Sequence, residues 1–239
     1  MSDRVERISQ LVEPWSPEDI LRWAFVTFGG RVEMATAFGP EGMVLIDIAS
    51  RVLPELKLFT LDTGFLFPET DRLMEQVEER YGFTIERVST ALTPADQDRE
   101  FGPALWSRDP DTCCQLRKIE PLRRKLADLR AWITSIRRDQ TSDRARALKV
   151  EWDPKFQLVK VNPLADWSAE QVWQYIREHG VPYNPLHDQG YPSIGCTHCT
   201  RSVRPGEDPR AGRWSGFAKT ECGLHTTGSL VSRIASART

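Results

Sequence analysis

Strand-like and helix-like segments alternate along the early part of the chain, and this alternation constrains the fold most. Apolar, strand-like runs lie at 31–38, 57–61 and 83–88, separated by helix-like segments at 43–53 and 68–81. Such alternation is typical of a parallel sheet, because the chain must cross back along a helix before the next strand can run parallel. The pattern predicts an α/β fold with a doubly wound, mainly parallel sheet.

The remaining segments extend this prediction and divide the chain in two. Two helices are expected within 3–28, further helices at 113–129 and 168–179, and further strands at 131–136 and 156–161. After residue 204 the chain is polar, with too little apolar surface for a core of its own. We expect an α/β domain over 1–204 and a flexible C-terminal arm over 205–239, disordered at 226–239.

The turns after the first two strands, at 38–42 and 62–64, each lead directly into a helix. In doubly wound sheets the ligand lies beyond the carboxyl ends of the strands, where helix N-termini offer free N–H groups to anions. A cationic stretch, 137–144, follows the strand expected at 131–136. The sequence therefore predicts an anion-binding site at this edge of the sheet.

Composition and charge narrow the classes of function. The 239 residues carry a net charge of −2, which argues against a protein that coats nucleic acid or an anionic membrane. The longest apolar run, at 43–46, is far shorter than the ~18 residues of a membrane-spanning helix. The mixed-charge first residues lack the apolar region of a secretion signal. We expect a cytoplasmic protein with reduced cysteines and no nucleic-acid or membrane partner.

Four of the five cysteines form two close pairs, Cys113 with Cys114 and Cys196 with Cys199, far apart in the sequence. Thiol pairs on distant segments are typical of a metal centre that joins them. Adjacent helical residues point about 100° apart, which suits the separate irons of a [4Fe–4S] cluster better than one tetrahedral zinc. We predict that these four cysteines bind one such cluster per chain. Zinc, or four reduced structural thiols, are the alternatives.

The fifth cysteine, Cys222, lies in a polar stretch between Lys219 and His225, with no apolar pattern to bury it. Nearby positive charge lowers the pKa of a thiol and raises the fraction of reactive thiolate. We therefore predict that Cys222 is a nucleophile. An inert exposed thiol is the alternative.

Several cations are candidates for holding an anionic substrate. Lys118 lies one turn after Cys114, between the predicted cluster and a substrate. Arg210 and Arg213 are three residues apart on the arm, and Arg144 ends the cationic stretch. Phosphate-like groups require such fixed cations and backbone N–H donors. Solvated surface charge is the alternative for each of them.

Five stretches together resemble the iron–sulfur branch of the adenylyl-sulfate (APS) and phosphoadenylyl-sulfate (PAPS) reductases, the assimilatory APS reductases. They are Cys-Cys-Gln-Leu-Arg-Lys at 113–118, Gly-Cys-Thr-His-Cys-Thr-Arg at 195–201, Lys-Thr-Glu-Cys-Gly-Leu-His at 219–225, Leu-Asp-Thr-Gly at 61–64 and Arg-Ala-Gly-Arg-Trp at 210–214. The resemblance covers about 30–225. It implies the adenine nucleotide α-hydrolase-like, Rossmann-like fold.

The resemblance also implies a reaction in assimilatory sulfate reduction. Cys222 as thiolate would attack the sulfur of adenosine 5′-phosphosulfate (APS), expel AMP and become a thiosulfonate. Reduced thioredoxin, or a glutaredoxin-like protein, would then attack the Cys222 sulfur and release sulfite. In the family the [4Fe–4S] cluster is not the electron source, and it acts structurally and electrostatically through a lysine that Lys118 matches.

The same resemblance implies roles for residues around the substrate. Arg210 and Arg213 match arginines that hold the phosphosulfate, and His225 matches a residue near the nucleophile. The other implied substrate contacts are Arg144, the adenosine-contacting Leu61 and Thr63, and the first-loop residues Phe38 and Gly39. Two positions depart from the family. Ala37 replaces a frequent serine, for which Thr36 or backbone N–H groups would compensate, and His198 replaces a frequent proline beside the cluster.

Three other functions stay open at this point. A PAPS reductase, or an enzyme that uses both nucleotides, would need a cation for the 3′-phosphate, which Arg137 or Arg138 offers. A zinc-containing, nucleotide-activating sulfurtransferase would carry a Ser-Gly-Gly-x-Asp-Ser loop, which 37–42 lacks. An iron–sulfur redox sensor would leave Cys222 without a role. The sequence also leaves a homo-oligomer open.

Overall fold

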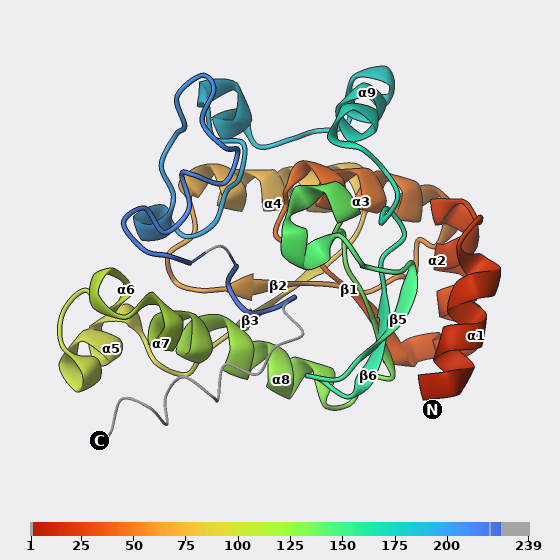
Figure 1. Cartoon of the computed structure of the whole chain (residues 1–239), viewed down its shortest axis with the longest axis horizontal. Helices are drawn as coiled ribbons and strands as arrows, with labels where there is room; N and C mark the ends of the chain where they lie inside the picture. The colour runs from red at the N-terminus through yellow and green to blue at the C-terminus, as the bar shows by residue number, and fades with distance from the viewer. Residues whose placement is uncertain (1, 220, 226–239) are drawn as a thin grey trace.

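A six-stranded sheet runs through the residues that the computed structural model describes, 2–219 and 221–225 (Figure 1). Its strands are β1 (Val32–Ala35), β2 (Leu58–Asp62), β3 (Ile85–Ser89), β4 (Ala131–Ile133), β5 (Val150–Asp153) and β6 (Leu158–Val161), in the spatial order β3-β2-β1-β4-β6-β5. All neighbours are parallel except β5, which pairs antiparallel with β6. The predicted mainly parallel sheet is confirmed.

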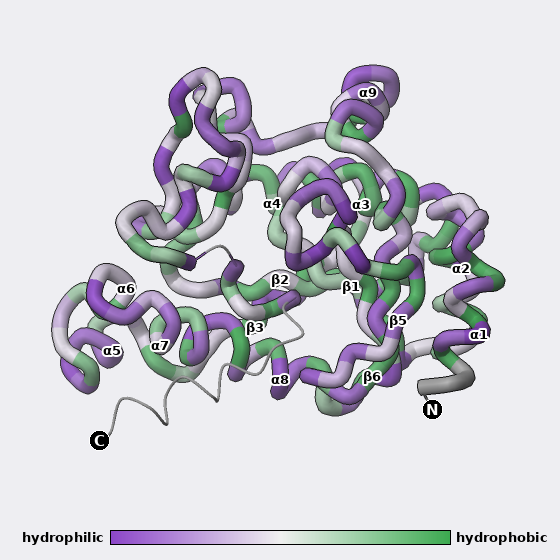
Figure 2. Tube along the Cα trace, viewed as in Figure 1, coloured by the Kyte–Doolittle hydropathy of each residue, from purple (hydrophilic) through white to green (hydrophobic). Residues whose placement is uncertain are grey.

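Helices cover both faces of the sheet. On one face a buried apolar core joins the strands to α1 (Ser2–Val12), α2 (Pro17–Phe28), α3 (Pro40–Val52), α4 (Pro68–Tyr81) and α9 (Ala169–His179). On the other face, Leu122 and Leu126 of α8 (Glu120–Leu126) pack with Phe59, Trp132 and Leu158. Figure 1 shows α3 and α4 across the strands from α8. In Figure 2 hydrophobic residues gather along β1 and α3, between these layers.

Local sequence sets the helix starts. Ser16 accepts a hydrogen bond from the Asp19 N–H where α2 begins, and Ser168 forms a capping box with Gln171 at α9. The polar stretch 94–111, expected to be a loop with helical turns, contains α5 (Pro94–Phe101) and α6 (Leu105–Arg108). Within the described ranges, no helix is long and apolar enough to cross a membrane.

The helix predicted at 113–129 begins earlier and is not uniform. It starts as α7 (Pro110–Cys114), widens into a π-helical turn over Gln115–Ile119, and continues as α8. Pro121, in the first turn of α8, lacks the N–H that would close an α-helical bond to residue 117, and a π-turn accommodates this gap. The π-turn carries Lys118 and lies immediately after Cys113 and Cys114.

The strand order reverses between β1 and β4, which are neighbours in the sheet although two strands separate them in sequence. In a doubly wound sheet such a switch point opens a crevice at the carboxyl ends of the strands. Two short 3₁₀ turns, Arg138–Gln140 and Ser142–Arg144, follow β4 at this edge. Strand β5 was not predicted, because its Val-Glu-Trp-Asp sequence is short and half charged.

The C-terminal segment is joined by backbone hydrogen bonds to the loop that carries Cys196 and Cys199. Short 3₁₀ turns over Pro185–Gln189 and Thr197–Cys199 shape this loop. Arg201 N–H donates to Gly212 O at 2.9 Å, and Trp214 N–H donates to Cys199 O at 3.1 Å. The Trp214 side chain is buried. The arm therefore packs on the domain rather than forming a core of its own, while the disorder predicted for 226–239 lies outside the described residues.

Candidate active site

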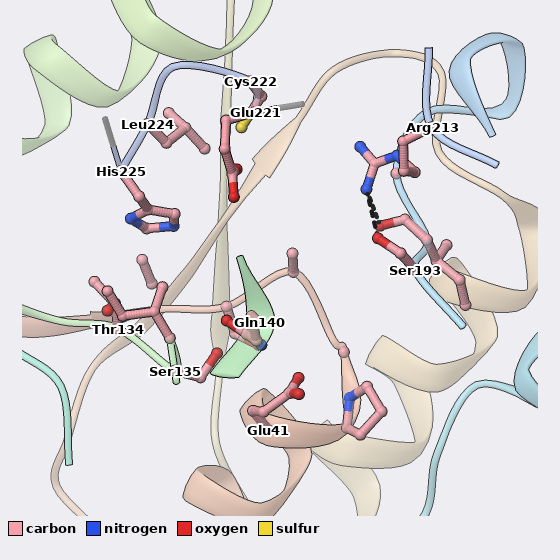
Figure 3. A pocket seen from close by; sticks show the side chains of 18 of the residues that line it. Glu41, Thr134, Ser135, Gln140, Ser193, Arg213, Glu221, Cys222, Leu224 and His225 are labelled. Carbon is pink, nitrogen blue, oxygen red and sulfur yellow. Dashed lines mark hydrogen bonds between the residues drawn. The ribbon is translucent and has the colours of Figure 1, made fainter. Parts of the chain in front are cut away.

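A cavity of about 490 Å³ lies at the switch point of the sheet. Its walls come from the carboxyl ends of β1, β2 and β4, and the arm contributes Glu221, Cys222, Leu224 and His225. The arm residues and the loop after β4 face one another across the cavity in Figure 3. Ligand cavities of ~300–1,000 Å³ hold molecules of nucleotide size. A cavity large enough for a nucleotide therefore lies at the edge where the sequence predicts a ligand, and the arm closes it on one side.

One lobe of the cavity is apolar and suits a flat aromatic group. Its lining includes Phe59, Leu61 and Leu122, with Trp132 of β4 beneath. The His225 ring stacks on Trp132, with centroids 5.7 Å apart and planes at 13°. Stacking of this kind is also how proteins hold a purine base.

His225 is buried, and this desolvation holds its pKa well below the ordinary value for histidine. The nearby cations Lys160, Arg144, Arg210 and Lys155 lower that pKa further. The imidazole is therefore neutral at physiological pH. His225 lies on the same arm as Cys222, as the sequence predicts, and its ring contact is with Trp132.

The other end of the cavity is cationic. Lys118, Arg144, Arg210 and Arg213 all line it, so the structure brings together the four cations that the sequence singled out. Arg213 donates from Nη1 to Ser193 Oγ at 3.1 Å and to Ile194 O at 3.2 Å, and Figure 3 shows the contact with Ser193. These bonds fix the guanidinium toward the cavity. Arg210 and Arg213 lie outside any helix, and both reach Ser193.

Lys118 keeps its charge in this half-buried position. Burial opposes the charged form, but the thiols of Cys196, Cys114 and Cys222 outweigh that cost and raise the pKa of Lys118. Lys118 therefore lies within electrostatic reach of both the cysteine pairs and the lone cysteine, as the sequence predicts.

The two arginines considered for a 3′-phosphate have carboxylate partners. Arg137 lines the cavity, but its Nε donates to Glu41 Oε1 at 2.9 Å, and Nη1 pairs with Asp139. Arg138 pairs with Glu13 and donates to Ala147 O at 2.7 Å. Their charges are neutralised within the fold.

All four predicted ligand cysteines line a second, small cavity beside the first. Cys113 and Cys114 lie at the end of α7, and Cys196 and Cys199 flank the turn Thr197–Cys199. His198 forms part of the wall, stacked on Trp106 with centroids 4.5 Å apart and planes at 8°. The histidine that replaces a frequent proline thus has an aromatic partner.

The chemistry of this second cavity fits a thiolate-bound cluster. Arg117 lines it, and its buried Nη2 has no hydrogen-bond partner among the described residues, while Nε and Nη1 are bonded to Gln97 and Thr63 O. A cation held there favours a net negative group between the cysteines. Thr63 Oγ1 also lies 3.3 Å from Cys196 Sγ.

Three of the four cysteines that line this second cavity, Cys113, Cys114 and Cys196, are buried. Across residues 2–219 and 221–225, no three His, Cys, Asp or Glu side chains are grouped to hold one metal ion. Burial, followed by the neighbouring thiols, raises the pKa of Cys113 to about 12 and that of Cys199 to about 11. Without a metal these thiols are protonated, and they are unsuited to nucleophilic attack.

Cys222 lines the larger cavity only, whereas the other four cysteines all line the second one, and its thiol lies within electrostatic reach of Lys118 and Arg210. The thiol lies close enough to raise the pKa values of Lys118 and Cys114, so it also stands near the second cavity. The cations near the Cys222 thiol include Lys118 and Arg210, which the sequence singled out, and Lys155, which it did not. Lys219 pairs with Asp111, and Lys155 donates to Gly223 O.

The first loop contributes Gly39, Pro40 and Glu41 to the cavity wall, and Figure 3 shows the Glu41 side chain there. Gly39 lines the cavity, but Phe38 does not, because its side chain is buried in the core. Phe38 has a φ of 56°, a strained conformation for a bulky residue that is most often found at functional loops. The hydroxyl of Thr36 accepts a hydrogen bond from the Phe38 N–H, so it braces this loop.

Two residues of the site, Glu221 and Ser193, were missed by sequence reasoning. Ser193 orients Arg210 and Arg213, and Glu221 pairs with Arg144 and Arg210. Glu221 lies directly before Cys222 in a stretch that the sequence analysis quoted, which was the available signal. Nothing in the sequence indicates which arginines it meets.

Fold and site define a doubly wound α/β protein whose switch-point cavity joins an aromatic lobe, a cationic end and one thiol beside a four-cysteine centre. The family model of the phosphoadenosine phosphosulfate reductase domain matches residues 31–202. An adenosine 5′-phosphosulfate reductase from Shouchella clausii is 48% identical, over 92% of each chain. A phosphoadenosine 5′-phosphosulfate reductase from Gloeobacter violaceus is 47% identical, over 92% of this chain and 93% of its own. The chain belongs to the APS and PAPS reductase family.

Solved structures agree with this assignment. The crystal structure of a PAPS reductase from Candida auris, in a phosphate complex, superposes with a TM-score of 0.74 at 31% identity, covering 85% of this chain and 98% of its own. An FMN adenylyltransferase from Candida glabrata superposes with a TM-score of 0.56 at 15% identity, covering 87% of this chain and 70% of its own. The second likeness concerns the fold alone.

Proposed function

We propose that this chain reduces adenosine 5′-phosphosulfate to sulfite and AMP in assimilatory sulfate reduction, with Cys222 as the nucleophile. The observation that carries the proposal is the position of the Cys222 thiol, at the cationic end of a cavity of nucleotide size. An anionic sulfuryl group held by those cations would lie beside the thiol. Many curated relatives named for this activity support the substrate class.

The reaction has two steps. In the first, the Cys222 thiolate attacks the sulfur of APS; an S–S bond forms, the S–O bond to the phosphate breaks, and AMP leaves. In the second, a thiolate of reduced thioredoxin, or of a glutaredoxin-like protein, attacks the Cys222 sulfur. Sulfite leaves with the electron pair of the S–S bond, and a mixed disulfide remains. The second thiol of the donor resolves it, restoring Cys222 and leaving the donor oxidised.

The residues around the thiol divide between the two ends of the substrate. Lys118, Arg144, Arg210 and Arg213 would hold the phosphosulfate and stabilise the charge that develops on the leaving phosphate. Leu61, Thr63, Trp132 and the backbone at Gly39 would hold the adenosine. The arm, residues 205–239, would carry Cys222 to the substrate and then present the thiosulfonate to the donor protein.

We propose that Cys113, Cys114, Cys196 and Cys199 hold one [4Fe–4S] cluster per chain. Bound there, the cluster would join α7 to the loop before the arm and supply negative charge next to Lys118. This role is structural and electrostatic, and both electrons for sulfite formation come from the donor protein. Reduced thiols and a thioredoxin donor favour the cytoplasm.

PAPS is the second candidate substrate, because some relatives, such as that of Gloeobacter violaceus, are named for it. A 3′-phosphate would need another cation. Arg137 and Arg138 are engaged by Glu41, Asp139 and Glu13, which supports the smaller nucleotide. A redox sensor without catalysis would give no role to a thiol placed in the substrate cavity.

Sulfite release by anaerobically purified protein with reduced thioredoxin tests the proposal. We expect turnover of APS, slower turnover of PAPS, and about four irons and four sulfides per chain. The Cys222→Ser variant should keep its iron and sulfide and release no sulfite. Sulfite release by Cys222→Ser, or faster turnover of PAPS than of APS, would contradict the proposal. Zinc in place of iron would overturn the cluster assignment.

A further inference from the structure

A carboxylate of the chain itself occupies the cationic end of the cavity. Glu221 Oε2 lies 2.9 Å from Arg144 Nη2 and 3.4 Å from Arg210 Nη2. Its other oxygen, Oε1, accepts a hydrogen bond from Thr141 Oγ1 at 3.2 Å. The Glu221 side chain is only 2% exposed, against 10% for Arg144 and 20% for Arg210. Glu221 is therefore held inside the site rather than on its surface.

This carboxylate is an oxyanion in the place where a substrate oxyanion would bind. Two guanidinium groups that converge on one carboxylate oxygen form the kind of site that binds phosphate or sulfate. In Figure 3 the Glu221 side chain points from the arm into the cavity, with the Cys222 sulfur beside its base. Arg213, in contrast, is held by Ser193 and Ile194 O.

We propose that Glu221 is a positioning residue that holds Arg144 and Arg210 while no anion is bound, and that the substrate's phosphosulfate replaces it there. The inference rests on the proposed function, since it uses the same four cations. Without a carboxylate, the clustered positive charges repel one another; Arg144 and Arg213 both act against the charge on Arg210, and Glu221 acts in its favour. Glu221 thus keeps the empty site organised.

Replacement of the Glu221 carboxylate by the phosphosulfate also affects the nucleophile, because Glu221 and Cys222 are adjacent in the chain. A peptide segment cannot keep the Glu221 carboxylate at the two arginines when a phosphosulfate takes them. Substrate binding therefore moves the Glu221 side chain, directly before Cys222 in the chain, and departure of AMP lets the carboxylate return. The affinity of the site for a phosphate is lowered by this competition, since a ligand binds only the fraction of molecules in which the arginines are free.

Binding of AMP and of adenosine, measured by calorimetry on the cluster-containing protein, tests the inference. AMP carries the phosphate and adenosine does not. Glu221→Gln keeps the size and the Thr141 contact but loses the charge, so AMP should bind at least about fivefold more tightly, with adenosine unchanged. The matched control is Glu207→Gln, on the same arm, which loses a carboxylate paired with Arg201 and should leave both affinities unchanged.

A second variant keeps the inference testable if Glu221→Gln does not fold. Thr141→Val removes the hydroxyl that donates to Glu221, loosens the carboxylate, and should tighten AMP binding by about twofold. Equal changes for AMP and adenosine, or AMP binding that is unchanged or weaker in Glu221→Gln, would overturn the inference. These titrations do not depend on turnover. If the protein forms no sulfite but Glu221→Gln tightens AMP binding, the proposed reductase activity is wrong while the role of Glu221 stands.

Discussion

Trp132 is the residue through which the arm and the sheet meet in the aromatic lobe. It is almost fully buried, packs with Phe59 and Leu158 on one face of the sheet, and stacks against His225. Because His225 is buried and neutral, docking of this part of the arm depends on its protonation state. Below the ordinary histidine pKa of ~6.5, the undocked state binds a proton that the docked state excludes.

Docking of the arm should therefore weaken as the pH falls below about 6.5, by at most ~1.4 kcal/mol per pH unit from this one group. Hydrogen exchange of the arm amides, measured from pH 7.5 to 5.5 after correction for the intrinsic rates, checks this. The His225→Gln variant should lose the pH dependence. His179→Gln, an exposed position on α9, should retain it. A His225→Gln protein with an unchanged pH dependence would contradict this role of His225.

At the residue scale, the structure brings together side chains whose chemistry is distinctive in the sequence. Lys118, Arg144, Arg210 and Arg213 line one cavity together with Cys222, and the two cysteine pairs line the other. The contacts between side chains from distant segments could not be predicted, because no local pattern indicates them. The ion pair of Lys219 with Asp111 is an example.

At the scale of elements, the loop with Cys196 and Cys199 and the arm behave as one unit. An isolated antiparallel bridge joins Thr200 to Arg213, and Gly212 lies against the Arg201 carbonyl. A Cβ at position 212 would overlap that carbonyl oxygen, which is backbone and cannot move aside. Glycine is required at position 212 because two backbone segments of the chain approach each other closely there.

Gly212→Ala should therefore loosen the arm from the cysteine loop, at a local cost of about 1–3 kcal/mol. Amide exchange of Arg201 and Trp214 should accelerate by roughly tenfold or more, and sulfite formation should fall. Gly30→Ala, where a Cβ meets nothing within 4 Å, is the matched control and should leave exchange in this region unchanged. Unchanged protection in Gly212→Ala would mean that the pairing does not hold the arm.

Helix and strand periodicity predicted most helices and strands of the domain, but not the π-helical turn before α8 or the edge strand β5. The helix 113–129 was predicted as uniform, whereas Pro121 forces a π-turn next to the paired cysteines. Strand β5 was not predicted because Glu151 makes its sequence pattern polar. In the sheet, Glu151 forms an ion pair with Lys160 of β6. Tertiary pairing decides such edge strands, and a single sequence does not contain that information.

At the scale of the whole molecule, the two cavities share Lys118 and Cys196 in their linings. The carboxyl ends of the strands wall the larger cavity, both cysteine pairs line the smaller one, and the arm brings Cys222 to the larger one. The motifs at 61–64, 113–118 and 195–201 lie at the ends of strands, helices or helical turns, whereas those at 210–214 and 219–225 lie outside the helices and strands that the structure describes. How the arm meets the cations through Glu221 required the three-dimensional structure.

In the proposed mechanism, Cys222 takes the sulfonate from APS and holds it until reduced thioredoxin releases it as sulfite. Peptide mass spectrometry after incubation with APS, without thioredoxin, measures this most directly. We expect the mass of one SO₃ group on the peptide that contains Cys222, one AMP released per adduct, and loss of the adduct as sulfite when reduced thioredoxin is added. An adduct on another cysteine, or sulfite formed by a Cys222→Ser protein under the same conditions, would contradict the account.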